Sequence, residues 1–145
     1  MKNRVEVIHG VNLDMLERRP SEHYGTLSLT ELEVRIGRFA RELGLETTFS
    51  QTNHEGEFCE LLHRAPEMAD GLILNPGAWT HYAWALRDAV EVTGLPCVEV
   101  HLSDVEGREP FRRLSVLEDV RVARVTGRGV DGYREALERL KAALA

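Results

Sequence analysis

Short apolar runs alternate with longer helical patterns along this chain, and the alternation constrains the fold more than any other sequence feature. The runs that are short enough to be strands cover residues 5–8, 47–50, 71–74, 97–100 and 120–125. Parallel strands need crossover connections, which are usually helices that cover the faces of the sheet. Five repeats of strand and helix therefore predict a parallel sheet with helices on both faces and right-handed crossovers.

Helical spacing of apolar residues predicts the connecting helices. The first pattern covers residues 29–43, with Ser28 and Glu31 as an expected capping box and Gly44 as the expected stop. Thr80 is the expected N-cap of the third pattern. The second, third and fourth patterns cover residues 58–65, 86–90 and 130–144.

The length of 145 residues, without repeats or linker-like stretches, predicts one domain over residues 1–145. A parallel sheet of this size predicts a flavodoxin-like α/β three-layer sandwich with strand order 2-1-3-4-5. In such sheets, ligands bind outside the carboxyl ends of the strands. The segments that follow the expected strands contain five of the six histidines, so we expect the functional site there.

Composition removes several functional classes. Hydrophobic residues make up 43% and charged residues 29% of the chain, which is typical of a globular protein. No apolar run approaches the roughly 18 residues of a membrane-spanning helix. The N-terminal segment lacks the features of a signal peptide, so a cytoplasmic location is expected. The formal net charge of −6, without a basic stripe, argues against nucleic acid as a partner.

Lysine and cysteine usage narrows the chemistry. The only two lysines, Lys2 and Lys141, lie near the ends of the sequence. Schiff-base catalysis needs a lysine desolvated inside a pocket, so imine chemistry is not expected. Cys59 and Cys97 have neither a metal-ligand nor a redox spacing, and we expect both to be buried core residues. No metal site is predicted.

Glu99 and His101 are the sharpest candidate pair. Residues two apart on a strand face the same side, so Glu99 could fix the tautomer of His101 and suit it to act as a general acid. A buried histidine satisfied by a carboxylate fits the same pattern equally well. His81, which follows Asn75 in the segment NPGAWTH, could contact a ligand or cap a helix.

Residues 17–25 form a polar, arginine-rich segment that we expect to be exposed and mobile. Such a segment beside a strand end fits a lid over an anionic substrate or a solvated connection. Within it, Tyr24 is a packing residue or, if Arg18 or Arg19 favours its phenolate, a base.

A second basic group follows the fourth expected strand. Arg108, Arg112 and Arg113 could bind a carboxylate, although a solvated charged face is the commoner explanation.

Two other functions of this fold are excluded by the same loops. The segment HGVNLDML after the first strand is not the Ser/Thr/Gly-rich phosphate loop of a flavodoxin. A receiver domain needs acidic residues and a lysine where this chain has His9, Asn75 and Thr126.

Taken together, these segments resemble the type II 3-dehydroquinate dehydratases along almost the whole chain. Residues 9–25, HGVNLDMLERRPSEHYG, are similar to the family motif NGPNLNxLGxREPxxYG. The other matching segments are QTNHEGE at 51–57, LNPGAWTH at 74–81, ALRDA at 85–89, EVHLSDVEGREPFRRLS at 99–115 and GRGVDGYREAL at 127–137.

The resemblance implies a hydro-lyase that converts 3-dehydroquinate to 3-dehydroshikimate by anti elimination through an enolate, without metal or organic cofactor. Tyr24 would be the base, kept ionised by Arg19, and Asn12 would stabilise the enolate through a bound water. His101 would protonate the departing hydroxyl, oriented by Glu99.

The resemblance also implies a binding set and an assembly. Arg18 and Arg108 would lie on or near the lid. Asp88 would reach the site of a neighbouring subunit in a homo-oligomer, a dodecamer of trimers. The substrate would be held by Asn75, His81, Asp88, Leu102, Ser103 and Arg112.

Several residues depart from the family pattern. Two of the departures, Asp104 and Glu106, add acids beside a site for an anion, where like charges would weaken binding unless they point outward. The others include His9, Val11 and Glu17. They leave open a diverged homologue that acts on, or only binds, a related cyclic polyol carboxylate. A purely structural subunit is disfavoured by the polar strand ends.

Overall fold

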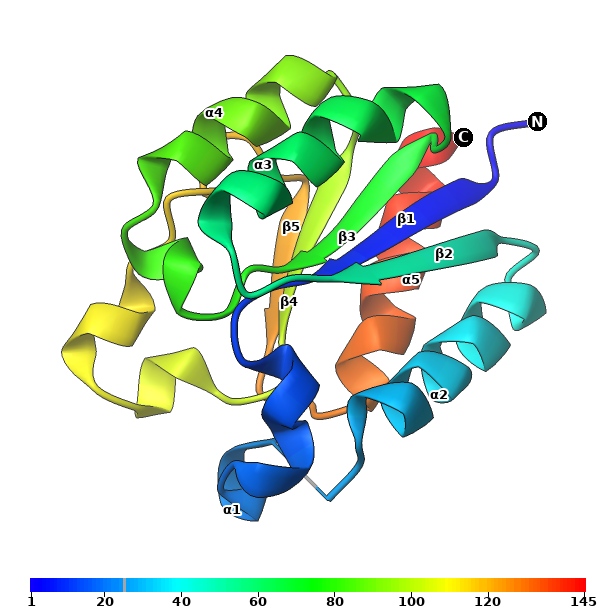
Figure 1. Ribbon diagram of the computed structural model, residues 1–145. Helices are drawn as coiled ribbons and strands as arrows, with labels where there is room; N and C mark the ends of the chain where they lie inside the picture. The colour runs from blue at the N-terminus through cyan, green and yellow to red at the C-terminus, as the bar shows by residue number, and fades with distance from the viewer. Residues whose placement is uncertain (25) are drawn as a thin grey trace.

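The sheet has the predicted architecture. The computed structural model describes residues 1–24 and 26–145, with Tyr24 described by its backbone alone. Its parallel strands are ordered β2-β1-β3-β4-β5 (Figure 1), so the flavodoxin-like order is confirmed. The strands are β1 (Arg4–His9), β2 (Glu46–Gln51), β3 (Gly71–Asn75), β4 (Cys97–His101) and β5 (Ala123–Thr126).

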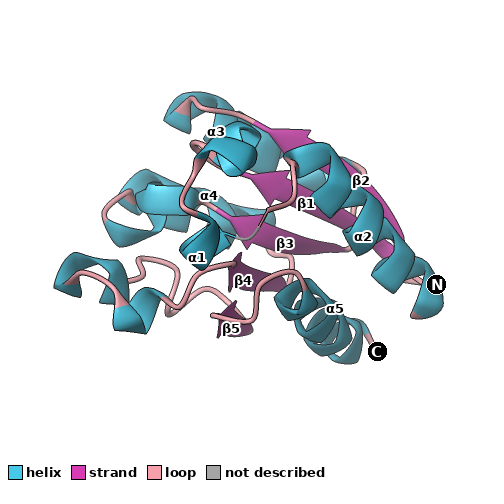
Figure 2. Ribbon diagram, turned by 90° about the horizontal axis from the view of Figure 1, so that it is seen from below, coloured by secondary structure: helices cyan, strands magenta, loops and turns pink. Residues whose placement is uncertain are grey.

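Helices cover both faces of the sheet (Figure 2). One face carries α2 (Leu29–Glu42) and α5 (Asp131–Leu144), and the other carries α3 (Glu55–Arg64) and α4 (Trp84–Thr93). Two apolar cores result, one on each face. Strand β1 serves both, because Val7 packs with α2 and α5 while Ile8 packs with α3 and α4.

The predicted capping box begins α2. The Ser28 hydroxyl accepts a hydrogen bond from the Glu31 amide at 3.2 Å, and the Glu31 carboxylate accepts one from the Ser28 amide at 3.2 Å. Gly44 follows the helix with φ of 77°, a left-handed conformation that glycine adopts without strain.

Thr80 is not the N-cap of α4, contrary to the sequence prediction. The helix begins at Trp84, after a 3-10 turn over Gly77–His81, and its N-cap is Ala83. The Thr80 hydroxyl instead donates to the Glu99 carboxylate at 2.5 Å. The Thr80 hydroxyl therefore binds the buried Glu99 carboxylate and does not cap the helix, although the sequence pattern predicts that it would.

The connection from β4 to β5 lacks the helix that five repeats of strand and helix would imply. Within the described residues 102–122 it contains two 3-10 turns, Val105–Gly107 and Pro110–Arg113, and no α-helix. Residues 120–122 lie outside β5, because the amides of Val120 and Arg121 both donate to the Leu117 carbonyl and form a turn.

Two smaller expectations need adjustment. Residues 17–25 are not a plain loop, since the 3-10 turn Leu13–Arg18 and the short helix α1 (Ser21–Tyr24) occupy most of the described part. Cys97 is fully buried as predicted, but Cys59 is only half-buried. Among the described residues, no helix has the length and apolar character needed to cross a membrane.

Candidate active site

A pocket lies at the carboxyl ends of the strands, where the sequence analysis places the site. In Figure 1 the segments that surround it, blue after β1 and yellow after β4, gather beyond the arrowheads of the strands. Most of the predicted binding residues line this pocket. They are Arg19, Asn75, His81, His101, Leu102, Ser103, Arg108 and Arg112.

Glu99 and His101 form a buried pair on β4. His101 Nε2 lies 2.5 Å from Glu99 Oε2, and both side chains are almost fully buried. Burial alone would raise the pKa of Glu99, but the hydrogen bonds and charge of His101, with the hydroxyls of Thr80 and Ser115, lower that pKa to about 2. The carboxylate is therefore ionised and holds Nε2, which leaves Nδ1 as the His101 nitrogen available to a ligand.

Glu99 has further partners that the sequence analysis missed. Its Oε1 accepts from Ser115 at 2.7 Å and from Arg121 Nη1 at 2.8 Å. Ser115 ends the segment 99–115, which resembles the family. Arg121 could not be predicted from the sequence, because it lies in a turn that forms on the Leu117 carbonyl.

His81 lines the pocket and is not the N-cap of α4. Its Nδ1 lies 2.8 Å from the Leu114 carbonyl, and because a carbonyl only accepts, Nδ1 carries the proton. Burial lowers the pKa of His81, and the charges of His101 and Arg112 lower it further. A neutral His81 thus offers Nε2 as a hydrogen-bond acceptor at the pocket.

Arginine side chains give the pocket a positive character. Arg19, Arg108 and Arg112 line it, so the solvated-face interpretation is wrong for Arg108 and Arg112. Arg108 Nη1 donates to Ser103 Oγ at 3.3 Å, and Arg112 Nε donates to the Glu109 carboxylate at 3.2 Å. Arg113 remains exposed. Guanidinium groups so placed suit a carboxylate-bearing ligand.

Close backbone contact between the β1 and β3 ends fixes the position of Asn75. A side chain at Gly10 would place its Cβ 2.4 Å from the Pro76 carbonyl oxygen, so only glycine fits there. The Gly10 amide donates to the Asn75 carbonyl at 2.7 Å, and Asn75 Oδ1 accepts from the Gly77 amide at 3.1 Å. The Asn75 side chain is consequently held at the pocket wall.

Three other predicted residues, Asn12, Asp88 and Arg18, do not line the pocket of this chain. Asn12 has a left-handed backbone (φ 69°) and donates its amide to Asn53, but its side chain is exposed and is not part of the lining. Asp88 lies on α4, 72% exposed and bonded to Arg87. Arg18 is exposed on the 3-10 turn. The Tyr24 side chain lies outside the described residues.

The two acidic departures are bonded to other parts of the protein. Asp104 accepts from the Glu106 amide at 3.2 Å and caps the turn Val105–Gly107, while Glu106 pairs with Arg124 at 2.7 Å. Neither lines the pocket. The buried departure His9 lies 3.2 Å from the Glu33 carboxylate, on the side of the sheet that α2 covers. Within the described part of the chain, no three His, Cys, Asp or Glu side chains are grouped to hold a metal ion.

Comparison with protein families shows which family the chain belongs to. The family model described as dehydroquinase class II matches residues 3–141. The chain belongs to the class II dehydroquinases. This membership confirms the resemblance recognised in the sequence.

Relatives of this class II dehydroquinase match it over nearly its whole length. A protein of Pelotomaculum thermopropionicum named 3-dehydroquinate dehydratase is 48% identical over 142 residues, 98% of each chain. One of Bacillus licheniformis with the same name is 47% identical over 131 residues, 90% of each chain. The solved type II dehydroquinase of Butyrivibrio crossotus has a TM-score of 0.92 at 35% identity, over 97% of this chain and 98% of that one.

Proposed function

We propose that this protein is a 3-dehydroquinate dehydratase, a hydro-lyase that converts 3-dehydroquinate to 3-dehydroshikimate. The observation that carries the proposal is the Glu99–His101 pair, buried and opening onto a pocket lined by arginines. Family membership and the names of the relatives support the same reaction. The departures do not favour the diverged homologue, because Asp104 and Glu106 are bonded outside the pocket.

The pocket offers groups for each part of the substrate. Arg112 would bind the carboxylate, since a guanidinium makes paired hydrogen bonds to it. Neutral His81 and Asn75 would bind ring hydroxyls, together with the backbone of Leu102 and Ser103. These contacts would hold the ring against His101, where the leaving hydroxyl must be protonated.

The elimination itself needs an acid and a base. His101 would donate the Nδ1 proton to the departing hydroxyl, while Glu99 stabilises the imidazolium through Nε2. Tyr24 would remove the proton α to the ketone, with Arg19 lowering its proton affinity. Asn12 would stabilise the enolate oxygen through a water molecule. No metal or organic cofactor takes part in this scheme.

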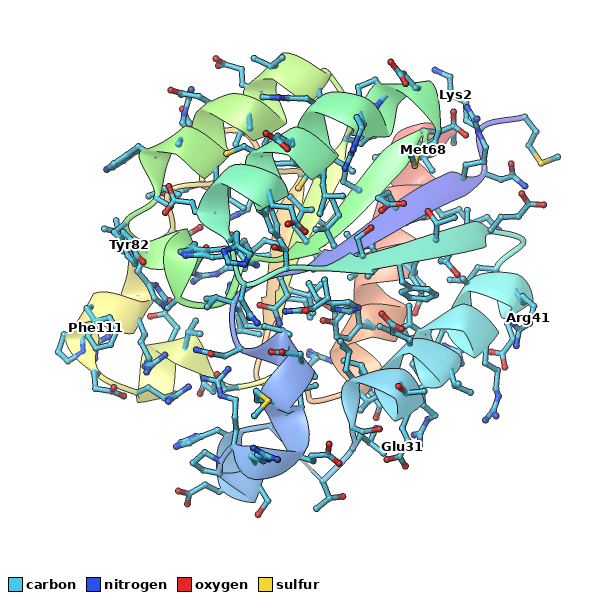
Figure 3. The ribbon with its side chains drawn as sticks, in the orientation of Figure 1. Lys2, Glu31, Arg41, Met68, Tyr82 and Phe111 are labelled. Atoms are coloured by element: carbon cyan, nitrogen blue, oxygen red, sulfur yellow. The ribbon has the colours of Figure 1, made fainter. Side chains whose placement is uncertain are left out.

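Assembly and location belong to the same proposal. We place the protein in the cytoplasm, in the shikimate pathway of aromatic amino acid biosynthesis, as a dodecamer built from trimers. Exposed apolar side chains support self-association, and Tyr82 and Phe111 lie on the same edge of the molecule in Figure 3. Trp84 and Leu114, close in sequence to these two, are also exposed.

The decisive experiment mixes purified protein with 3-dehydroquinate, without metals or nucleotides, and follows ultraviolet absorbance of the conjugated enone product. We expect a steady rise that pre-treatment with borohydride plus substrate does not abolish, because no lysine imine is involved. Saturable binding without product would instead support the diverged, binding-only homologue. If neither product formation nor binding is observed, 3-dehydroquinate is not the substrate.

A further inference from the structure

The buried carboxylate of Glu99 is shared between a histidine and an arginine. Oε2 receives hydrogen bonds from Thr80 and His101, each at 2.5 Å. Oε1 receives bonds from Ser115 at 2.7 Å and Arg121 at 2.8 Å. The carboxylate thus accepts four hydrogen bonds, which is its full capacity. The histidine binds one of its oxygens and the arginine binds the other.

Arg121 is largely buried where it contacts Glu99. It lies in the turn before β5, and its amide is bonded to the Leu117 carbonyl at 3.0 Å. Its side chain is 14% exposed although guanidinium groups are normally solvated. The charge is directed inward, onto the carboxylate behind the candidate acid.

A permanent cation at this position changes how the pair binds protons. A buried carboxylate with a single histidine partner can lose its charge by taking the histidine proton, because an isolated buried charge is costly. A guanidinium on the other oxygen keeps the carboxylate ionised when His101 is neutral. It also opposes the imidazolium charge, so the proton leaves His101 more readily.

We propose that Arg121 is a positioning residue for the elimination: acting through Glu99, it keeps that carboxylate ionised throughout turnover and makes His101 a stronger acid. This proposal rests on the function proposed above, in which His101 protonates the departing hydroxyl. Arg121 itself does not line the pocket.

Other charged or titratable groups near the pair also influence the protonation of His101. The pocket brings in His81, whose ring lies 6.5 Å from that of His101, together with the arginines Arg19, Arg108 and Arg112. On β4 the buried Cys97 has a pKa raised by burial and by Glu99, so its thiol is neutral.

Strand β5 supplies a matched control. Arg124 is the register partner of Glu99, yet its guanidinium bonds Glu106 at 2.7 Å rather than Glu99. Removing Arg124 deletes the same charge from the neighbouring strand without touching the pair.

The test is a titration of His101 in wild type and variants, using protein with 13C-labelled histidine and no substrate. His101→Gln assigns the signal. In Arg121→Gln we expect the pKa of His101 to rise by about one unit, the size typical of a nearby charge. Arg121→Lys should restore most of the wild-type value, and Arg124→Gln should shift it far less. Arg121→Met, which keeps the stem of the side chain, provides a second charge deletion if the glutamine variant does not fold.

Kinetics supply the second reading. With a weaker acid, the basic limb of the kcat profile should move to higher pH by the same amount, and kcat on the plateau should fall severalfold while KM changes little. An unchanged or lowered pKa of His101 in Arg121→Gln and in Arg121→Met would overturn the proposal. Because the titration needs no turnover, an inactive wild type would refute the proposed function without deciding this one.

Discussion

At the scale of single residues, the bond between His101 Nε2 and Glu99 decides which ring nitrogen can serve the substrate. Replacing His101 by Ala should remove the acid while leaving Arg112, His81 and Asn75 to bind the ring. We expect kcat to fall by about 10² to 10⁴, the usual contribution of a general acid. The dissociation constant of the substrate, measured by calorimetry, should change little. Equal losses in binding and turnover would count against the acid role.

Tyr24→Phe tests the base. The change deletes only the hydroxyl, so turnover should drop below about one hundredth of wild type, as expected when a general base is lost. Thermal unfolding followed by circular dichroism should show an intact fold. A variant with a near-normal rate would remove Tyr24 from the mechanism.

Glu99 also predicts a dependence of stability on pH. Its pKa lies at about 2, below the ordinary 4.5, because hydrogen bonds from His101, Thr80 and Ser115 outweigh burial. A depressed carboxyl pKa stabilises the fold above the unfolded value, and this contribution is lost as pH falls from about 4.5 towards 2. Denaturant unfolding should therefore show a steeper acid loss in wild type than in Glu99→Gln, which cannot titrate. Parallel curves would contradict the assignment.

Sequence reasoning at this scale succeeded where strand geometry alone sets the contact. Residues two apart on a strand share a face, which brought Glu99 and His101 together in the prediction. The partners Thr80 and Arg121 were missed because they approach Glu99 from a 3-10 turn and a turn before β5. Their positions depend on tertiary contacts, which periodicity does not encode.

At the scale of elements, the capping box of α2 is the clearest local device. Ser28→Ala would leave the Glu31 amide without its side-chain acceptor. We expect the free energy of unfolding to fall by about 1 kcal/mol, the typical value of an N-cap. Thr30→Ala, an exposed change in the first turn, should alter it by less than about 0.5 kcal/mol. A loss no larger at Ser28 than at Thr30 would show that the box contributes nothing.

The other elements show how far local patterns reach. Strand β1 was predictable from Val5, Val7 and Ile8, because burial on both faces favours apolar residues on both sides, although Glu6 interrupts the run. Residues 120–122 were expected in the fifth strand but lie before β5, because the amides of Val120 and Arg121 donate to the Leu117 carbonyl. Local composition could not show this, because the turn depends on where the Leu117 carbonyl lies in the folded chain.

At the scale of the whole molecule, the strand order was predictable from the number of strand–helix units and the rule for crossovers. The close contact of Gly10 with Pro76 joins the ends of β1 and β3 at the site. The proposed assembly can be tested through Asp88. Asp88 is exposed on α4 and away from its own pocket. If it serves a neighbour's site, each active site takes residues from two chains.

Subunit mixing tests this sharing directly. His101→Ala lacks the acid but keeps Asp88, whereas Asp88→Ala keeps the acid but lacks the residue offered to its neighbour. Each variant alone should turn over slowly. After joint unfolding and refolding in equal amounts, a site that pairs an intact His101 with an intact Asp88 should form in roughly a quarter of cases, because neighbours in a closed ring are drawn at random. Steady-state rates should recover towards that fraction of wild type. If the refolded mixture is only as active as the mean of its parents, Asp88 works within its own chain or not at all.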